Sequence, residues 1–305
     1  MLKFFRPLAA LALSALAPVH GADRLTVASL NTVMTDIARN VGGDNVEITA
    51  IVKPGVDPHD FEPSPGDIKK VSNSQIVLAS GLGFETYLDK LRQSVGTKPT
   101  FVIAGDAIKP IMGFDECDHD HSAAGHEHGD SANTPDPHWF HSIRNAEIVT
   151  NQIRDAFSNA DPGNKTAYFS NAAAYQSRLD SLAKWVRVEL AKLPKTRRVL
   201  VTSHDALGYF ARDNGFRVLP VAGFSSSDQP SSQRVTDLIQ EIRDAKVKAI
   251  FAESIENPKI LVEITKETGA RLGGAIYADG LGDKEATTFD SMMRYNVSTI
   301  VQGLE

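Results

Sequence analysis

Residues 164–193 read NKTAYFSNAAAYQSRLDSLAKWVRVELAKL, a stretch that carries one continuous apolar face. Its large apolar side chains recur at spacings of three and four, the repeat of an amphipathic helix; they are Tyr175, Leu179, Leu182, Val186, Leu190 and Leu193. At 1.5 Å per residue, about 30 residues would make a helix roughly 45 Å long, enough to run past two lobes. The stripe lasts about three heptads, so the seam of a coiled-coil dimer is the alternative.

On both sides of this stretch, short apolar runs alternate with helical patterns. Strands are expected at residues 25–30, 47–52, 75–80 and 100–104 before it, and at 198–203, 217–221, 248–253 and 275–278 after it. Such alternation predicts parallel βαβ units. We therefore expect an α/β protein of two lobes, 22–162 and 194–305, each a central sheet flanked by helices. One long bridging helix, 163–193, would join them.

The composition is that of a globular protein with an acidic balance. The 305 residues have a formal net charge of −6, which argues against a nucleic-acid binder, since such proteins normally present a basic face. A single Cys excludes an intrachain disulfide and any zinc site built from several cysteines. The chain is long enough to bury a sizeable core without disulfides, and we expect a monomer.

Residues 1–21, MLKFFRPLAALALSALAPVHG, have the pattern of a signal peptide. Two basic residues precede an apolar run that is too short to span a bilayer, and the small Val19 and Gly21 suit a cleavage site. We therefore expect a soluble protein in the periplasm, with an uncleaved anchor as the alternative. Because no Cys stands at the cleavage point, a lipid anchor is not expected there.

Residues 115–137, DECDHDHSAAGHEHGDSANTPDP, have almost no apolar content and predict a surface loop. Carboxylates alternate in it with His119, His121, His126 and His128. This composition indicates metal binding, and we expect a second, weaker metal-capture site. A solubilising insertion that binds metal incidentally is the alternative. Cys117 could add a thiolate ligand or be an incidental free thiol.

Four polar residues fall at loop positions where α/β folds place their ligands. His59 lies in the turn KPGVDPHDFEPSP, His138 in PDPHW, His204 directly after RVLVTS, and Asp279 directly after AIYA. Each alone is a weak signal, because a loop His is usually solvated and an Asp after a strand is often a helix N-cap. Together, three neutral imidazoles and a carboxylate would make a closed four-coordinate shell, which suits Zn²⁺. Shells richer in oxygen suit Mn²⁺ better.

Other polar residues near these positions could support the metal ligands. One candidate to orient an imidazole, by accepting its other N–H, is Asp205 beside His204. Asp60 and Glu62 are further candidates for this role. His141 lies three residues after His138, so both would share a face if a helix begins there. His141 could then lie near the metal, and a place behind one of the metal ligands or at the surface is the alternative.

A family resemblance covers the whole mature chain. It rests on VKPGVDPHDFEPSPGDI, DPHWF, VTSHDALGYFA and ETGARLGGAIYADGLGD, which occur in this order. With them the chain resembles the TroA/ZnuA-like (cluster A-I) solute-binding proteins of ABC importers, and within them the AztC-type zinc-binding proteins. The DPHWFH segment departs from the common DPHxWL form, so the helix after His138 is expected to start differently.

The resemblance implies a metal held between two lobes, with His59 and His138 from the first and His204 and Asp279 from the second. Some relatives carry Glu at the third position and bind manganese, so His204 favours zinc. The implied function is an extracytoplasmic receptor that delivers Zn²⁺ to an ABC permease and its ATPase, with a zinc-donating periplasmic protein as a further candidate partner.

Three alternatives compete with this function. A manganese receptor of the same family is one, and a periplasmic metal buffer or adhesin is another. A zinc hydrolase is disfavoured, because a catalytic site keeps an open coordination position and the chain has no H-E-x-x-H motif. We therefore do not expect an enzyme.

Overall fold

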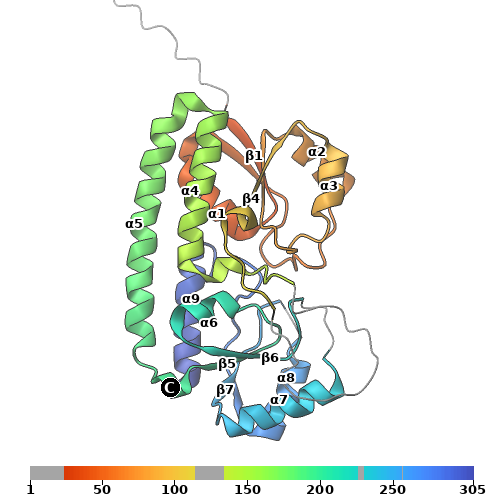
Figure 1. Ribbon diagram of the computed structural model, residues 1–305, viewed down its shortest axis with the longest axis vertical. Coiled ribbons are helices and arrows are strands. Elements are labelled where there is room, and N and C mark those ends of the chain that lie inside the picture. The colour runs from red at the N-terminus through yellow and green to blue at the C-terminus, as the bar shows by residue number, and fades with distance from the viewer. Residues whose placement is uncertain (1–23, 114–133, 226–229, 256) are drawn as a thin grey trace, which may run out of the picture.

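A computed structural model describes residues 24–113, 134–225, 230–255 and 257–305, and it shows two α/β lobes beside one long helix (Figure 1). This confirms the predicted fold class. The expected signal peptide lies outside the described residues, and so do Cys117 and the four loop histidines, His119, His121, His126 and His128. Among the described residues, no helix is long and apolar enough to cross a membrane.

The first lobe is a four-stranded parallel sheet in the order β2–β1–β3–β4. Its strands are β1 Leu25–Ser29, β2 Val46–Ala50, β3 Ile76–Ala79 and β4 Thr100–Ile103. The central strands are apolar on both faces, as expected for a sheet covered by helices on both sides. Alternate residues such as Val27 and Ala28 enter two different apolar clusters. The first cluster contains α1 (Thr32–Gly42) and the second contains α2 (Pro65–Asn73) and α3 (Leu88–Val95).

The second lobe has two two-stranded sheets, formed by β5 Val199–Thr202 with β6 Arg217–Pro220 and by β7 Ala249–Ile250 with β8 Arg271–Leu272. The pairs β5–β6 and β7–β8 are parallel, and Phe251 N donates to Val201 O at 2.9 Å between them. The helices of this lobe are α6 Gly208–Asn214, α7 Ser232–Asp244, α8 Lys259–Thr268 and α9 Phe289–Leu304. The strand predicted at 275–278 is reduced to one bridge between Glu253 and Ile276.

The quoted stretch forms helix α5, Lys165–Leu190, which runs along the side of both lobes beside α4 and α9 (Figure 1). Its apolar stripe packs on helices of the same chain, and its members from Tyr175 to Leu190 are at most 3% exposed. The stripe is therefore covered within one molecule, which removes the basis for a dimer seam. A short 3₁₀ turn, Pro162–Asn164, precedes the helix, so it begins slightly later than predicted.

Helix α4, Ile143–Ala160, is the helix expected after His138, although its bounds were not predicted. A 3₁₀ turn, Trp139–His141, follows His138, and Ser142 then caps α4 by accepting a hydrogen bond from Asn145 N at 3.3 Å. Helix α4 thus begins at Ile143, after this turn, and not at His138. As a result, His138 lies in irregular backbone where its side chain is free to face the second lobe.

Candidate metal centre

The four predicted ligands come from loops that leave the strands of both lobes and meet between them. His59 lies in the loop after β2, and His138 lies just before the 3₁₀ turn at Trp139–His141. His204 follows β5 by two residues, and Asp279 lies in the loop after β8. Residues more than 200 positions apart in the sequence thereby come into contact, as His59 and Asp279 do.

The four ligand atoms lie within 4.8 Å of one another, and five of their six separations are close to those of a small tetrahedron. Asp279 Oδ1 lies 3.2 Å from His59 Nε2, 3.4 Å from His138 Nε2 and 3.2 Å from His204 Nε2. The Nε2 of His138 is 3.3 Å from that of His59 and 3.4 Å from that of His204. A tetrahedron whose centre lies 2.0–2.1 Å from each corner has edges of about 3.3–3.4 Å, so these separations match a four-coordinate Zn²⁺.

The four ligand side chains are almost completely buried, which is unusual for polar side chains that have no cation between them. The side chains of His138 and His204 are fully buried, that of Asp279 is 2% exposed and that of His59 6%. Burial alone would raise the pKa of Asp279, but the surrounding histidines outweigh it and hold this pKa well below its ordinary value. An ionised carboxylate in a dry site needs compensating positive charge, which a divalent metal supplies.

The outer nitrogens of two imidazoles contact buried carboxylates. Asp136 Oδ1 lies 2.9 Å from His138 Nδ1, and Glu253 Oε2 lies 2.5 Å from His204 Nδ1. A carboxylate that accepts from Nδ1–H leaves the lone pair of Nε2 for a metal. Burial would lower the pKa of both histidines, but these carboxylates and Asp279 outweigh it, so both pKa values are raised.

Two Asp-Pro-His tripeptides, 57–59 and 136–138, fix the ligand backbones in the first lobe. Because Pro has no N–H, each Asp side chain bonds the next amide, an Asx turn. Asp57 Oδ1 accepts from His59 N at 2.9 Å, and Asp136 Oδ1 accepts from His138 N at 2.8 Å. The local sequence therefore presets the positions from which both histidines leave the chain.

The residues predicted to orient the imidazoles are placed differently. Asp60 and Glu62 are exposed. Asp205 donates its backbone N–H to Gly223 O at 2.8 Å. Burial, and the nearby charge of Asp136, raise the pKa of the Asp205 carboxyl to about 6. The carboxylates that contact imidazole nitrogens are Asp136 and Glu253, neither of which the sequence had singled out. Glu253 ends the predicted strand 248–253, the same kind of position that identified His204. His141 is buried and contacts Ala278 O.

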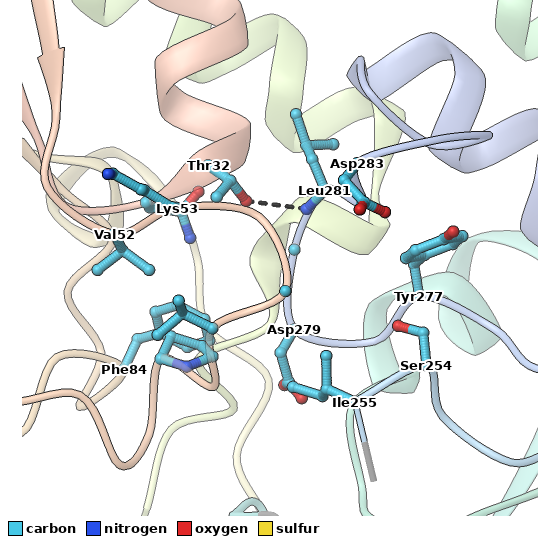
Figure 2. Close-up of a pocket in the computed structure, with 16 residues that line it drawn as sticks. Thr32, Val52, Lys53, Phe84, Ser254, Ile255, Tyr277, Asp279, Leu281 and Asp283 are labelled. Carbon is cyan, nitrogen blue, oxygen red and sulfur yellow. Dashed lines mark hydrogen bonds between the residues drawn. The ribbon is translucent and has the colours of Figure 1, made fainter.

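A cavity of about 130 Å³ opens beside Asp279, between the two lobes (Figure 2). Lys53 and Phe84 line it from the first lobe, and Ser254 and Tyr277 line it from the second. Its mixed polar lining suits a hydrated approach to the buried ligands.

Comparisons with known proteins agree with this fold. A family model described as the periplasmic component A of a zinc-uptake complex matches residues 27–303. The chain is 33% identical to the manganese-binding lipoprotein MntA of Bacillus subtilis over 290 residues, 93% of this chain and 90% of that protein. It is 32% identical to the iron-binding protein YfeA of Yersinia pestis over 289 residues, 94% of this chain and 88% of that protein.

Two solved structures are similar in fold. The periplasmic zinc-binding protein TroA of Treponema pallidum has a TM-score of 0.81 at 26% identity, covering 92% of this chain and 99% of that one. The manganese-bound periplasmic metal-binding protein of Candidatus Liberibacter asiaticus also has a TM-score of 0.81, at 28% identity, covering 92% of this chain and 100% of the other.

Fold and site together define a two-lobed metal-binding receptor. The chain belongs to the ZnuA/TroA family of periplasmic metal-binding substrate-binding proteins of ABC transporters. The narrower assignment to the AztC type stays a prediction.

Proposed function

We propose that the protein is a zinc receptor that holds Zn²⁺ between its lobes through His59, His138, His204 and Asp279. The observation that carries this proposal is the cluster of four ligand atoms, in which five of the six separations are 3.2–3.4 Å and fit a zinc ion. Three imidazole nitrogens and one carboxylate oxygen are a donor set that zinc favours over harder cations.

One observation favours manganese as the second candidate. Asp279 Oδ2 is buried and has no hydrogen-bond partner among the described residues. If both carboxylate oxygens bound the cation, the site would become five-coordinate and richer in oxygen, which suits Mn²⁺ better. The relatives named above as manganese- and iron-binding make this comparison necessary.

The family membership supports delivery to a permease and its ATPase, which we propose as partners, and it supports a place of action outside the cytoplasmic membrane. The His-rich segment, with His119, His121, His126 and His128, would supply metal to this centre by raising its local concentration. A hydrolase is the weaker hypothesis, because four protein ligands leave no coordination position for a reacting water.

Competitive titration of the metal-stripped protein with Zn²⁺ and Mn²⁺ against a strong chelator tests the proposal, and elemental analysis gives the stoichiometry. We expect one tight Zn²⁺ per chain, bound more strongly than Mn²⁺. His204→Ala and Asp279→Ala should each weaken binding by orders of magnitude. Asp244→Ala, which changes an exposed carboxylate on α7, is the matched control and should leave affinity unchanged. Near wild-type affinity in His204→Ala would refute the proposal.

A further inference from the structure

The short segment that carries Asp279 is attached to the opposite lobe at both ends. His141 donates its Nε2 hydrogen to Ala278 O at 2.6 Å, on one side of Asp279. Leu281 N donates to Thr32 Oγ1 at 2.8 Å, on the other side (Figure 2). His141 and Thr32 both belong to the first lobe, whereas residues 278–281 belong to the second.

His141 is built into the interior as a neutral donor. It is 1% exposed, and burial is the main cause that lowers its pKa to about 4. A carbonyl oxygen can only accept, so Nε2 must carry the hydrogen. The imidazole therefore presents one fixed N–H to Ala278 across the physiological pH range.

Thr32 is held just as firmly. It is the first residue of α1, and Asn31 caps that helix by accepting hydrogen bonds from Val33 N at 2.8 Å and Met34 N at 3.0 Å. Segment 278–281 approaches it closely at Gly280, whose φ of 153° favours glycine. A Cβ at Gly280 would lie 2.4 Å from Thr32 Oγ1, so this approach requires the absence of a side chain.

The 3₁₀ turn Trp139–His141 connects the neighbourhoods of two ligands from opposite lobes. His141 N donates to His138 O at 3.1 Å, so the turn that follows His138 also carries the donor to Ala278. A shift of this turn would move His138 and the backbone next to Asp279 together. Metal–ligand distances tolerate only about 0.2 Å, so small shifts here matter for affinity.

We propose that His141 and Thr32 are positioning residues that hold Asp279 against the three histidines, so that metal release requires the lobes to break both contacts. This inference rests on the proposed function, since it assumes that the four residues bind the metal. It adds two residues that do not touch the metal, and it identifies segment 278–281 as the part that must move.

Matched pairs of variants test the proposal through the rate at which zinc passes from the loaded protein to excess chelator. His141→Leu removes the donor, and we expect dissociation to become about tenfold faster, since about one net hydrogen bond is lost. His141→Gln keeps an N–H donor and should restore a rate within about threefold of the wild type. Thr32→Val removes the acceptor and should act as His141→Leu does, whereas Thr32→Ser should restore the slow rate.

A double-mutant cycle separates positioning from a general structural role. Zinc affinity is measured for His141→Leu and Thr32→Val alone and combined with Asp279→Ala. If these residues act through Asp279, their effect disappears once Asp279 is removed. An equal loss in both backgrounds, or no loss with Asp279 present, would overturn the proposal. If His141→Leu does not fold, the Thr32 pair decides alone, and a wild-type protein that binds no zinc refutes the proposed function instead.

Discussion

Glu253 holds His204 with both of its carboxylate oxygens: Oε2 lies 2.5 Å from the ring Nδ1, and Oε1 accepts from the backbone N at 3.1 Å. Asp136 does the same for His138 with one oxygen, at 2.9 Å from Nδ1 and 2.8 Å from the backbone N. Each lobe thus contains one ligand histidine whose backbone and ring are fixed by the same buried carboxylate. The position and the tautomer of these imidazoles are therefore set together.

Removing the charge of Glu253 should weaken zinc binding without touching the metal. Glu253→Gln keeps the size of the side chain but makes the imidazole less basic and its tautomer less defined, so we expect about 10–100-fold lower affinity. Competitive titration measures it. Glu263→Gln, an exposed change on α8, is the control and should bind as the wild type does. Wild-type affinity in Glu253→Gln would show that the contact does not support the ligand.

A methyl group placed behind Asp136 should act in the same way. The Cβ of Gly208→Ala would lie 2.6 Å from Asp136 Oδ2, too close for this carboxylate to keep its position. Because this carboxylate must shift from the position in which it holds His138, we expect zinc affinity to fall about tenfold. Gly215→Ala is the matched control, because its φ of 68° strains an alanine but nothing lies within 4 Å of the new Cβ. It should lower the free energy of unfolding by about 1 kcal/mol and leave affinity unchanged; equal affinity in both variants would contradict the argument.

Zinc affinity should fall as the pH falls, and the fall should begin above the ordinary histidine pKa of 6.5. Asp136, Glu253 and Asp279 raise the pKa of His138 and His204 against the effect of burial. In the metal-free protein these rings therefore bind protons at higher pH than free histidine does. Zinc must displace these protons. Each displaced proton therefore lowers the zinc affinity about tenfold for every pH unit below the pKa of its ring. Chelator-corrected dissociation constants between about pH 5.5 and 8 measure the slope, and a flat profile would contradict it.

The sequence predicted what depends on local pattern. The stripe from Tyr175 to Leu190 identified α5, and loop positions after strands identified His204 and Asp279. A helix was expected after His138, but the extent of α4 was not predicted, because its buried face is built partly from small or polar residues, such as Ala146 and Asn145. The contact of Glu253 with the ring of His204 joins residues 49 positions apart and depends on how the chain packs, so spacing could not give it. The same holds for His141, whose partner is 137 residues away. Asp136 lies only two residues before His138, so the Asp-Pro-His pattern is the local signal that could have identified it.

Glu85 should make the stability of the metal-free protein depend on pH. Burial raises its pKa to about 7, although the N–H groups of Ser80 and Gly81, at 2.7 and 2.9 Å, partly offset this. The unfolded value is near 4.5, so the folded protein holds the proton more tightly. Its stabilising contribution is complete below that pH and is lost as the pH rises through about 7.

Glu85→Gln cannot lose a proton, so the stability difference between wild type and variant should change with pH. We expect the wild type to lose about 2–3 kcal/mol relative to Glu85→Gln between about pH 5 and pH 8. Urea unfolding with chelator present measures this, and the titration of the ligand histidines cancels in the difference. Glu263→Gln should give a curve parallel to the wild type. A parallel curve for Glu85→Gln as well would mean that Glu85 is ionised in the fold throughout this range.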